Sequence, residues 1–472
     1  MRTDRLGLGL VLATTLSACV STGVREDLAE IRELTQAIAL ADVGGQVEDV
    51  SAPDVAEILQ APLDADAAVR IALVNNRELR ATLRELGVAR GRLLQAGLLA
   101  NPLVDVEIAP ERQTGFVARV EWDVATLLLT PLRAEAASAD LDVARFDAAG
   151  MVIETGYMVR DAFHELLAAE EQLAVAQRQL DALAAARDAA RALQTAGNFA
   201  ALAVSAREAV YEEERVHVAE MELTALVARE EVQRLLGLHG EEASWTTAGP
   251  LPPVPAEASD PPDTERRAVE ASLELRAMQR RMVAAARRAG LARTEGIIPE
   301  LLVDVHILVG DQTAVGGGFF TGAPTTIGGG LSLRIPVFDR GDGLVAAYEH
   351  QLDAWYERYV GVAIDVRSAA RESRARLLSS RARAQHYADT VLPARQRVLD
   401  QTLLQYDAMQ VSVFQLLDAL RARQETEMAA IDTRHEYWSA AAALDALLAG
   451  HRIESGHGAS ATTTHGMTGG GE

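Results

Sequence analysis

The side chains best suited to binding a ligand chemically lie near the C-terminus of the chain. Three imidazoles and one thioether stand there as candidate metal ligands: His451, His457, His465 and Met467. Such side chains suit copper or zinc. They are scattered through residues 450–472, a Gly/Ser/Thr-rich stretch that we expect to be disordered. The sequence therefore predicts no formed metal site and no cofactor, and it leaves these four residues as candidates only.

No signature of an enzyme accompanies them. The chain contains no Gly-x-Ser-x-Gly, no His-Glu-x-x-His and no phosphate-binding glycine loop that ends in Lys-Ser or Lys-Thr. Its formal net charge of −23 would repel the phosphates of nucleic acid. The charge would suit a cation-attracting surface or channel, but we expect solvated helix faces to account for most of it. The sequence therefore predicts a non-enzymatic protein without a nucleic-acid partner.

The N-terminus has the character of a targeting segment. It carries two arginines among its first five residues and then a short apolar run, too short to span a bilayer. The segment ends in Leu16-Ser17-Ala18-Cys19, which resembles a bacterial lipobox. That resemblance implies a signal peptide over 1–18 and acylation, including palmitate, of Cys19; the alternative is a simple secretory signal. The residue after the cysteine is valine and not aspartate, which favours sorting to the outer membrane.

Charged and apolar side chains alternate in a short stretch that occurs twice. The sequence LVDVEI at 103–108 returns as LVDVHI at 302–307, 199 residues later. Alternation of this kind predicts a β-strand with its valines on one face and its charged side chains on the other. Two further alternating runs, 115–123 and 327–335, bring the predicted strands to four.

One face of these strands would be polar. The residues predicted there are Asp105, Glu107, Arg119, Glu121, Asp304, His306 and Arg334. Strands of about nine residues match the length of a tilted membrane strand. Four strands cannot close a barrel, and an open edge is not tolerated in lipid, but three chains would supply twelve. The polar side chains would then line a wet lumen. The alternative is a soluble four-stranded sheet packed on helices.

Long helices surround the predicted strands. Apolar periodicity predicts a helix over 63–99, a second over 131–195 and a returning helix over 201–238. At 1.5 Å per residue the second would be roughly 100 Å long, and small residues at heptad spacing within it are typical of a coiled coil. The pattern recurs in the second half, with a Gly-rich loop over 309–325 and a kink expected at Pro393.

These patterns predict a mainly α-helical protein with a small β part, built by duplication. The expected order is a signal peptide (1–18), a lipid-anchored segment (19–62), a first repeat (63–238), a Pro-rich linker (239–263), a second repeat (264–449) and a disordered tail (450–472). Within the polar segment that follows Cys19 we expect only one short helix, near 54–59.

Three stretches resemble the TolC-like outer-membrane efflux family, the outer membrane factors. They are ALVNNRELR at 72–80, QAGLLANP at 95–102 and IPVFDRG at 335–341. Their order and duplication carry the resemblance, which covers about residues 60–450. It implies a homotrimer, with a twelve-stranded β-barrel in the outer membrane of a Gram-negative bacterium above an α-helical barrel in the periplasm.

The resemblance also implies partners. A periplasmic membrane-fusion adaptor and an inner-membrane pump of the RND or ABC type would deliver solutes such as drugs or metal ions, and outer-membrane lipid would surround the strands. The alternative function is a lipid-tethered periplasmic coiled-coil spacer without a pore.

The turns between the long helices are the expected adaptor contacts. By resemblance the docking residues are Gly197, Asn198, Phe199, Met409, Gln410, Val411 and Ser412, and aperture candidates near that end are Asp407 and Asp418. Met409 stands where the family usually has glycine. The alternative is that these are ordinary helix-turn residues and solvated surface carboxylates.

Overall fold

The computed structural model describes most of the chain in several stretches. These are residues 24–35, 52–109, 115–197, 200–240, 244–256, 262–309, 318–322 and 325–453. Some residues singled out above lie outside the described stretches, namely Cys19, Asn198, Phe199, His457, His465 and Met467. Their predicted roles therefore stay predictions.

The chain forms two compact units that cut across the two sequence repeats. One unit comprises Met1–Glu33, Leu83–Arg145 and Ala277–Glu357, and the other comprises Leu34–Thr82, Phe146–Arg276 and Arg358–Glu472. Each unit thus takes matching parts from both repeats.

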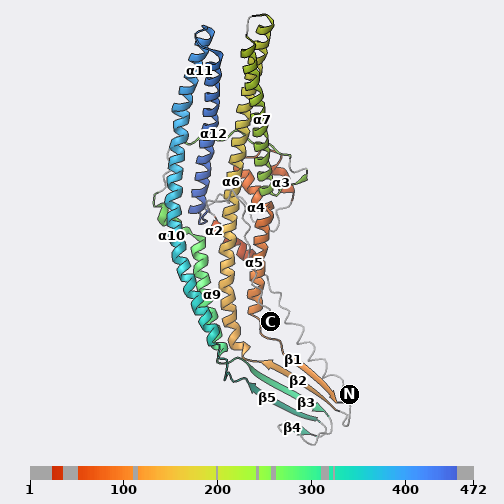
Figure 1. Ribbon diagram of the computed structural model, residues 1–472. Helices are drawn as coiled ribbons and strands as arrows, with labels where there is room; N and C mark the ends of the chain where they lie inside the picture. Colours follow the sequence, from red (N-terminus) through yellow and green to blue (C-terminus); the bar gives the residue numbers. More distant parts are fainter. Residues whose placement is uncertain are drawn as a thin grey trace. The chain divides into compact units, whose positions relative to one another are not determined.

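A single antiparallel sheet contains the predicted strands (Figure 1). The four are β1 (Leu103–Ala109), β2 (Gly115–Asp123), β3 (Leu301–Val309) and β5 (Thr325–Leu333). The prediction of a plain loop over 309–325 is wrong, because β4 (Gly318–Gly322) pairs with β5 and the strand order is β1-β2-β3-β5-β4. The sequence of β4, GFFTG, lacks the apolar–polar alternation that marks the other strands.

The sheet keeps two incompletely paired edges. In the described part of the chain, strand β1 has β2 as its one neighbour, and β4 pairs only with Thr325–Gly328 of β5. Within the described residues, Gly329–Leu333 of β5 therefore have a strand partner on one side only. A sheet with such edges presents backbone donors and acceptors to further strands.

Helices make up most of the rest of the described chain up to residue 238. They are α2 (Val24–Thr35), α3 (Ala52–Ile58), α4 (Ala65–Asn75), α5 (Arg77–Ala96), α6 (Thr126–Thr195) and α7 (Ala201–Leu236). Helix α2 was not expected, and α6, with 70 residues, begins before Pro131 rather than at it. Its start is fixed by Asp123, whose carboxylate accepts the N–H of Ala125 at 3.0 Å.

The predicted helix over 63–99 is interrupted at Asn76, so that it forms α4 and α5. The amide of Asn75 donates to the carbonyls of Leu236 (3.1 Å) and Gly237 (3.0 Å), and the amide of Asn76 donates to Leu235 (2.8 Å). The Asn76 side chain also accepts the N–H of Leu79 at 2.9 Å and so caps α5. The two asparagines of the ALVNNRELR stretch thus satisfy the last carbonyls of α7.

The second repeat reproduces this architecture. Its helices are α8 (Thr264–Ala271), α9 (Leu273–Glu295), α10 (Asp342–His386), α11 (Leu392–Asp407) and α12 (Val413–Leu448). The break between α8 and α9 at Ser272 corresponds to the break at Asn76. A Cβ on Gly450 would lie 2.5 Å from the carbonyl oxygen of Ala271, just as one on Gly237 would lie 2.7 Å from that of Asn75. The two halves of the chain therefore share the same helix break and the same close backbone approach.

The expected kink at Pro393 takes another form. Five residues, Tyr387–Val391, form a π-helical turn (η2) between α10 and α11, and Pro393 follows in the first turn of α11. A π-turn accommodates an extra residue without ending the helix. Among the described residues, no helix combines the length with the apolar character that a bilayer crossing requires.

Small residues form the buried seam of α6. Ala169, Ala176, Leu183 and Ala190, which are spaced seven apart, are all buried, and Leu166 is fully buried. Leu173 and Leu180 are half-buried. Small side chains at a seam allow helices to approach closely, as the heptad pattern predicted.

Candidate functional site

The sheet separates polar from apolar side chains as the alternation predicted. Its register places Arg119 opposite both Asp105 and His306, and Glu121 opposite Asp304. Glu107 has the same strand parity as Asp105 and lies on the same face. One face of the sheet therefore carries six of the seven predicted polar residues.

The opposite face is apolar, and the residues that the structure describes leave it uncovered. Val104, Val106 and Val305 lie on it and are 63%, 58% and 54% exposed. The same face carries Val120 and Leu331, which are also exposed. An exposed apolar area of this kind marks a surface that meets a partner or lipid.

Glycines in β5 make room for the polar face, a feature that the sequence reading missed. Gly328 pairs with His306 and Gly330 pairs with Asp304. A Cβ at either glycine would overlap the opposite side chain. His306 Nδ1 lies 3.0 Å from Asp304 Oδ1, and Arg119 Nε lies 3.9 Å from the same oxygen. The run of glycines was the available signal, because Gly328 and Gly330 take the polar-face positions opposite His306 and Asp304.

Arg334 lies outside the sheet. It was expected in a fourth strand that runs to Ile335, but β5 ends at Leu333. Its guanidinium pairs with Glu300 at 2.7 Å, and its N–H donates to the carbonyl of the same residue at 3.3 Å. Arg334 thus ties the segment after β5 to the segment before β3.

The turns after α6 and α11 have the same local design. Gly197 has φ +78° and its N–H donates to the carbonyl of Gln194 (2.8 Å). Met409 has φ +57° and donates to Tyr406 (2.9 Å), while Gln410 donates to Gln405 (2.8 Å). The pair of bonds at Met409 is the Schellman arrangement, which normally places glycine in the left-handed position.

Replacing Met409 with glycine should therefore stabilise the protein. A non-glycine residue in the left-handed region costs about 1–2 kcal/mol, and the Met409 side chain is 94% exposed, so little packing is lost. We expect Met409→Gly to raise the thermal unfolding midpoint of the purified protein. The neighbouring Ala408→Gly is the control, since Ala408 has φ −80° and glycine there should lower it. A lower midpoint for Met409→Gly contradicts the interpretation.

The residue pair after the second turn forms a capping box. Ser412 Oγ accepts the N–H of Gln415 at 3.4 Å, and Gln415 Oε1 accepts the N–H of Ser412 at 2.9 Å. Ser412 and Gln410 thus have roles in the turn itself. Apolar side chains are left exposed around it, with Met409, Leu404 and Phe414 at or near the turn. Asp407, the last residue of α11, and Asp418 in α12 are both exposed.

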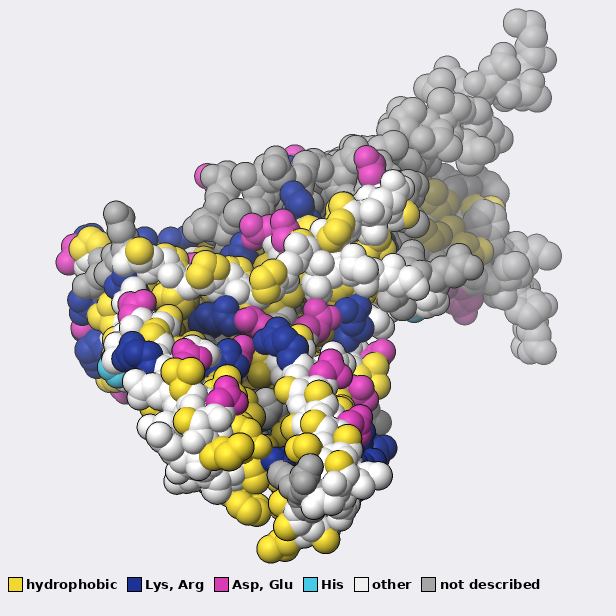
Figure 2. Space-filling model, turned by 90° about the horizontal axis from the view of Figure 1, so that it is seen from above, with side chains coloured by type: hydrophobic (Ala, Val, Ile, Leu, Met, Phe, Trp, Pro, Cys, Tyr) yellow, Lys and Arg dark blue, Asp and Glu magenta, His cyan; other side chains and the backbone are white. Residues whose placement is uncertain are grey.

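Ion pairs align the two repeats along these helices. Arg421 pairs with Glu213 at 3.4 Å, and Arg178 pairs with Glu427 at 3.1 Å. Figure 2 shows acidic and basic side chains intermixed on the visible face. Exposed pairs of this kind contribute about 0–1 kcal/mol each. They therefore set the register between helices more than they stabilise the fold.

The Pro-rich linker is held against the helices by two arginines of different repeats. Arg229 of α7 pairs with Glu170 (2.6 Å) and donates to the carbonyl of Trp245 (3.0 Å). Arg434 of α12 pairs with Glu171 (2.6 Å) and donates to the carbonyl of Leu251 (3.2 Å). Adjacent glutamates of α6 thus serve both arginines.

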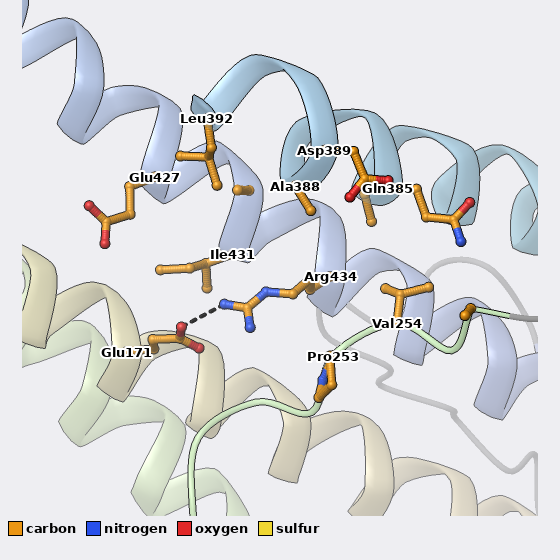
Figure 3. Close-up of a pocket in the computed structure, with 13 residues that line it drawn as sticks. Glu171, Pro253, Val254, Gln385, Ala388, Asp389, Leu392, Glu427, Ile431 and Arg434 are labelled. Atoms are coloured by element: carbon orange, nitrogen blue, oxygen red, sulfur yellow. Dashed lines mark hydrogen bonds and ion pairs between the residues drawn. The ribbon is translucent and has the colours of Figure 1, made fainter. Parts of the chain in front are cut away.

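A cavity of about 480 Å³ lies between this linker and the helices. Pro253 and Val254 form one wall, and Figure 3 shows Arg434 and Glu171 directed toward one another across its floor. The π-turn contributes Ala388 and Asp389 to the opposite side. The linker is therefore part of the packed structure and closes over the contact between α6 and α12.

The buried histidine His164, between the repeats, is not poised for acid–base chemistry. Burial, together with the nearby charge of His435, lowers the pKa of His164 to about 4. The imidazole is neutral near pH 7 and packs on Trp438, with 5.4 Å between the ring centres. His164 therefore acts as a packing residue.

His451, the first of the candidate metal ligands, belongs to the folded part. Its Nε2 lies 3.5 Å from a carboxylate oxygen of Glu154, and its ring lies against Gly150. The described residues contain no group of three His, Cys, Asp or Glu side chains arranged to hold a metal. Of the tail expected over 450–472, the structure describes only 450–453, where the end of α12 brings His451 onto α6.

Comparison with known proteins connects this geometry to membrane channels. No protein-family profile matches the chain. The cobalt-zinc-cadmium resistance protein CzcC of Cupriavidus metallidurans is 22% identical over 423 residues, which is 87% of this chain and 95% of CzcC.

Solved structures agree over most of the chain. A membrane protein from Pseudomonas aeruginosa has a TM-score of 0.69 at 18% identity, over 81% of this chain and 93% of that one. The CmeC outer membrane channel of Campylobacter jejuni has a TM-score of 0.67 at 13% identity, over 82% and 86%. None of these three proteins is named as an enzyme, in agreement with the missing catalytic motifs. The chain thus has the fold of the TolC-like outer-membrane channels, and the resemblance read from its sequence is confirmed.

Proposed function

We propose that the chain is the outer-membrane channel of a tripartite efflux system. The observation that carries this proposal is the sheet, in which an uncovered apolar face is paired with a charged one. A soluble sheet would bury its apolar face against helices, whereas a membrane strand turns it to lipid and its polar face to water. The resistance function named for CzcC and the channel named for CmeC support the same proposal.

The edges of the sheet support a homotrimer. An unpaired edge is not tolerated in lipid, so β1 of one copy must pair with a strand of another. The free half of β5, Gly329–Leu333, offers that pairing. The four longer strands from three chains then give a barrel of twelve, with Asp105, Glu107, Glu121 and Asp304 facing the lumen. The short β4 lies at the loop end of β5.

The partners and the location follow from the same proposal. A periplasmic adaptor and an inner-membrane pump of the RND or ABC type supply the energy and the substrate, and metal ions are among the candidate substrates. Acylation at Cys19 anchors the N-terminus in the outer membrane, and the long helices α6, α7, α11 and α12 form the periplasmic barrel.

Conductance separates this function from that of a pore-free spacer. Purified full-length protein, with its content of trimer measured beforehand, would be added to a planar bilayer. We expect discrete, long-lived current steps, because a closed barrel leaves a water-filled path. Trimers that insert but carry no current would overturn the channel and favour the lipid-tethered spacer.

A negative charge at either helix turn should abolish efflux. We expect Gly197→Asp and Val411→Asp to bring resistance down to the level of a deletion strain, because the exposed apolar turn would no longer match the adaptor. Gly197→Asn is the matched control, since asparagine has the same shape and tolerates the left-handed region but adds no charge. Trimer content and outer-membrane level should be unchanged in all three variants. Wild-type resistance in both aspartate variants would remove the docking assignment.

A further inference from the structure

Helix α2 is attached to the first unit through a buried carboxylate. Asp27 is completely buried, and two arginines from distant parts of the chain bind it. Arg90 of α5 donates from Nε and Nη2, each at 2.9 Å, so that both carboxylate oxygens are bound. Arg145 of α6 donates to Oδ1 from Nε at 2.9 Å and from Nη2 at 2.5 Å. Asp27 thus accepts four charge-assisted hydrogen bonds.

The network extends beyond this carboxylate. Arg145 also pairs with Glu30, one turn further along α2, at 2.8 Å and with Asp142 at 3.1 Å. Arg280 of α9 lies 3.4 Å from the other oxygen of Asp142. Burial opposes the charge of Arg145, but the hydrogen bond and charge of Asp27, with Glu30 and Asp142, outweigh it and raise the pKa of Arg145 above its usual value. Arg145 therefore remains a cation in this site.

The contact of Asp27 with the two arginines fixes the position of α2 more than it stabilises the fold. The side chains of Arg90 and Arg145 are only 16% and 17% exposed, so both guanidiniums are largely removed from water. A buried ion pair adds little net stability because the cost of desolvation offsets the attraction. Removing one partner, however, leaves the remaining charges buried without a counter-charge. Ile31, one turn after Asp27, is also buried. Helix α2 can therefore dock in one place, where its single buried carboxylate meets both arginines.

We propose that Asp27 is the positioning residue that docks the lipid-bearing N-terminus onto helices α5 and α6. This inference rests on the acylation of Cys19 in the proposed function. Eight residues separate positions 19 and 27, and they span at most about 28 Å when extended. The docked carboxylate therefore limits where the acyl chains can enter the membrane relative to α5 and α6. Without it, the lipid would be a loose tether.

Proteolysis of the full-length protein in native membranes tests the docking. Arg32 lies within α2, and trypsin needs an extended backbone, so the rate of cleavage after Arg32 reports the fraction of α2 that has left its site and unwound. Asp27→Asn should increase that rate about 100-fold, since breaking a buried ion pair shifts such an equilibrium by at least that factor. Glu26→Gln is the matched control: it removes the same charge from the adjacent residue, whose side chain is 83% exposed, and should change the rate less than twofold.

Two outcomes of this experiment overturn the proposal. One is an Asp27→Asn protein as resistant as the wild type, and the other is equal sensitivity of the two variants. Coupling with Arg145 distinguishes docking from a general loss of helix stability. Asp27→Asn combined with Arg145→Gln should cleave no faster than Asp27→Asn alone, whereas independent effects would multiply.

Mass spectrometry of the released N-terminal peptide tests the lipid part. We expect an acylated Cys19 on the N-terminal peptide that trypsin cuts from the Asp27→Asn protein and that detergent extracts from the membrane. An unmodified Cys19 would overturn the tether, even if α2 proves to be docked. The channel function would survive that result, because it is measured separately as bilayer conductance. Loss of conductance with normal docking would instead overturn the channel and leave the Asp27 contact in place.

Discussion

The substitution Gly296→Ala should prevent accumulation of folded protein, whereas Gly97→Ala should leave it intact. The two glycines occupy equivalent positions, 199 residues apart, after the helix that precedes each first strand. A Cβ on Gly296 would overlap the backbone carbonyl of Arg340, which has no freedom to rotate away. A Cβ on Gly97 would meet its nearest atom, the carbonyl oxygen of Leu94, at an ordinary 3.5 Å.

The expected cost at Gly296 is about 3 kcal/mol or more, because overpacking against a backbone atom forces the chain to move. The neighbouring turn cannot yield easily. Gly341 has φ +73° there, and its own Cβ would lie 3.0 Å from the carbonyl oxygen of Ala292. The IPVFDRG stretch is thus fixed by this crossing of two backbones.

Outer-membrane yield and urea unfolding of both variants would measure the difference. Gly290→Ala, within α9, is a second control, since a Cβ there meets nothing within 4 Å and alanine is the better helix former. Wild-type stability for Gly296→Ala would show that the two segments do not cross as described.

Val106→Arg is expected to block membrane insertion, while Glu107→Arg on the adjacent residue is expected to permit it. Val106 lies in the middle of β1 on the apolar face and is more than half exposed. Arginine on a lipid-facing strand costs about 2–4 kcal/mol at the bilayer midplane. In the proposed trimer, three copies would multiply that cost. Glu107 points to the opposite, polar face, where a change of charge leaves the lipid contact unaltered.

Refolding into lipid vesicles measures this prediction directly. The fraction of heat-resistant trimer on unheated gels would be compared for the two variants and the wild type. Equal insertion of Val106→Arg and Glu107→Arg would mean that the two faces are not lipid and lumen. If Val106→Arg inserted better than Glu107→Arg, the valine face would instead be the lumen face and the charged face would meet lipid.

Regular patterns in the sequence predicted the regular parts of the fold. The alternation around Asp105 and Asp304 located β1 and β3, because a period of two fixes both the strand and its faces. Seven-residue spacing located the seam of α6 at Ala169 and Ala176. Signals of this kind are local, and they do not depend on what the rest of the chain does.

Features set by contacts between residues far apart in the sequence were missed, because no local pattern marks them. The helix ends at Asn75 because α7 supplies carbonyls to its amide, and those carbonyls lie 161 and 162 residues away in sequence. Helix α2 docks through Asp27 because Arg90 and Arg145 converge on it. Strand β4 pairs with β5 through backbone bonds that need no side-chain pattern. Only the fold brings such partners together.

The two helix turns of the candidate site show the same contrast between a feature with a local sequence signal and a feature without one. Gly197 was a clear turn signal, since glycine adopts a positive φ without strain. Met409 matched no glycine rule, yet it has the same left-handed conformation. At that turn, hydrogen bonds from the N–H groups of Met409 and Gln410 to the end of α11 hold the backbone in the left-handed conformation. The Met409 side chain is exposed there, so its type is not fixed by packing.

The two free edges of the sheet bear on how the protein reaches its final state. A single chain inserted alone would leave the backbone groups of β1 and Gly329–Leu333 without partners in hydrocarbon, where each costs several kcal/mol. In the proposed trimer, insertion of one copy is therefore uphill until the other two arrive. The rate of channel formation should then depend on a high power of the protein concentration. When fewer chains reach the membrane, this rate should fall far more steeply than the concentration does.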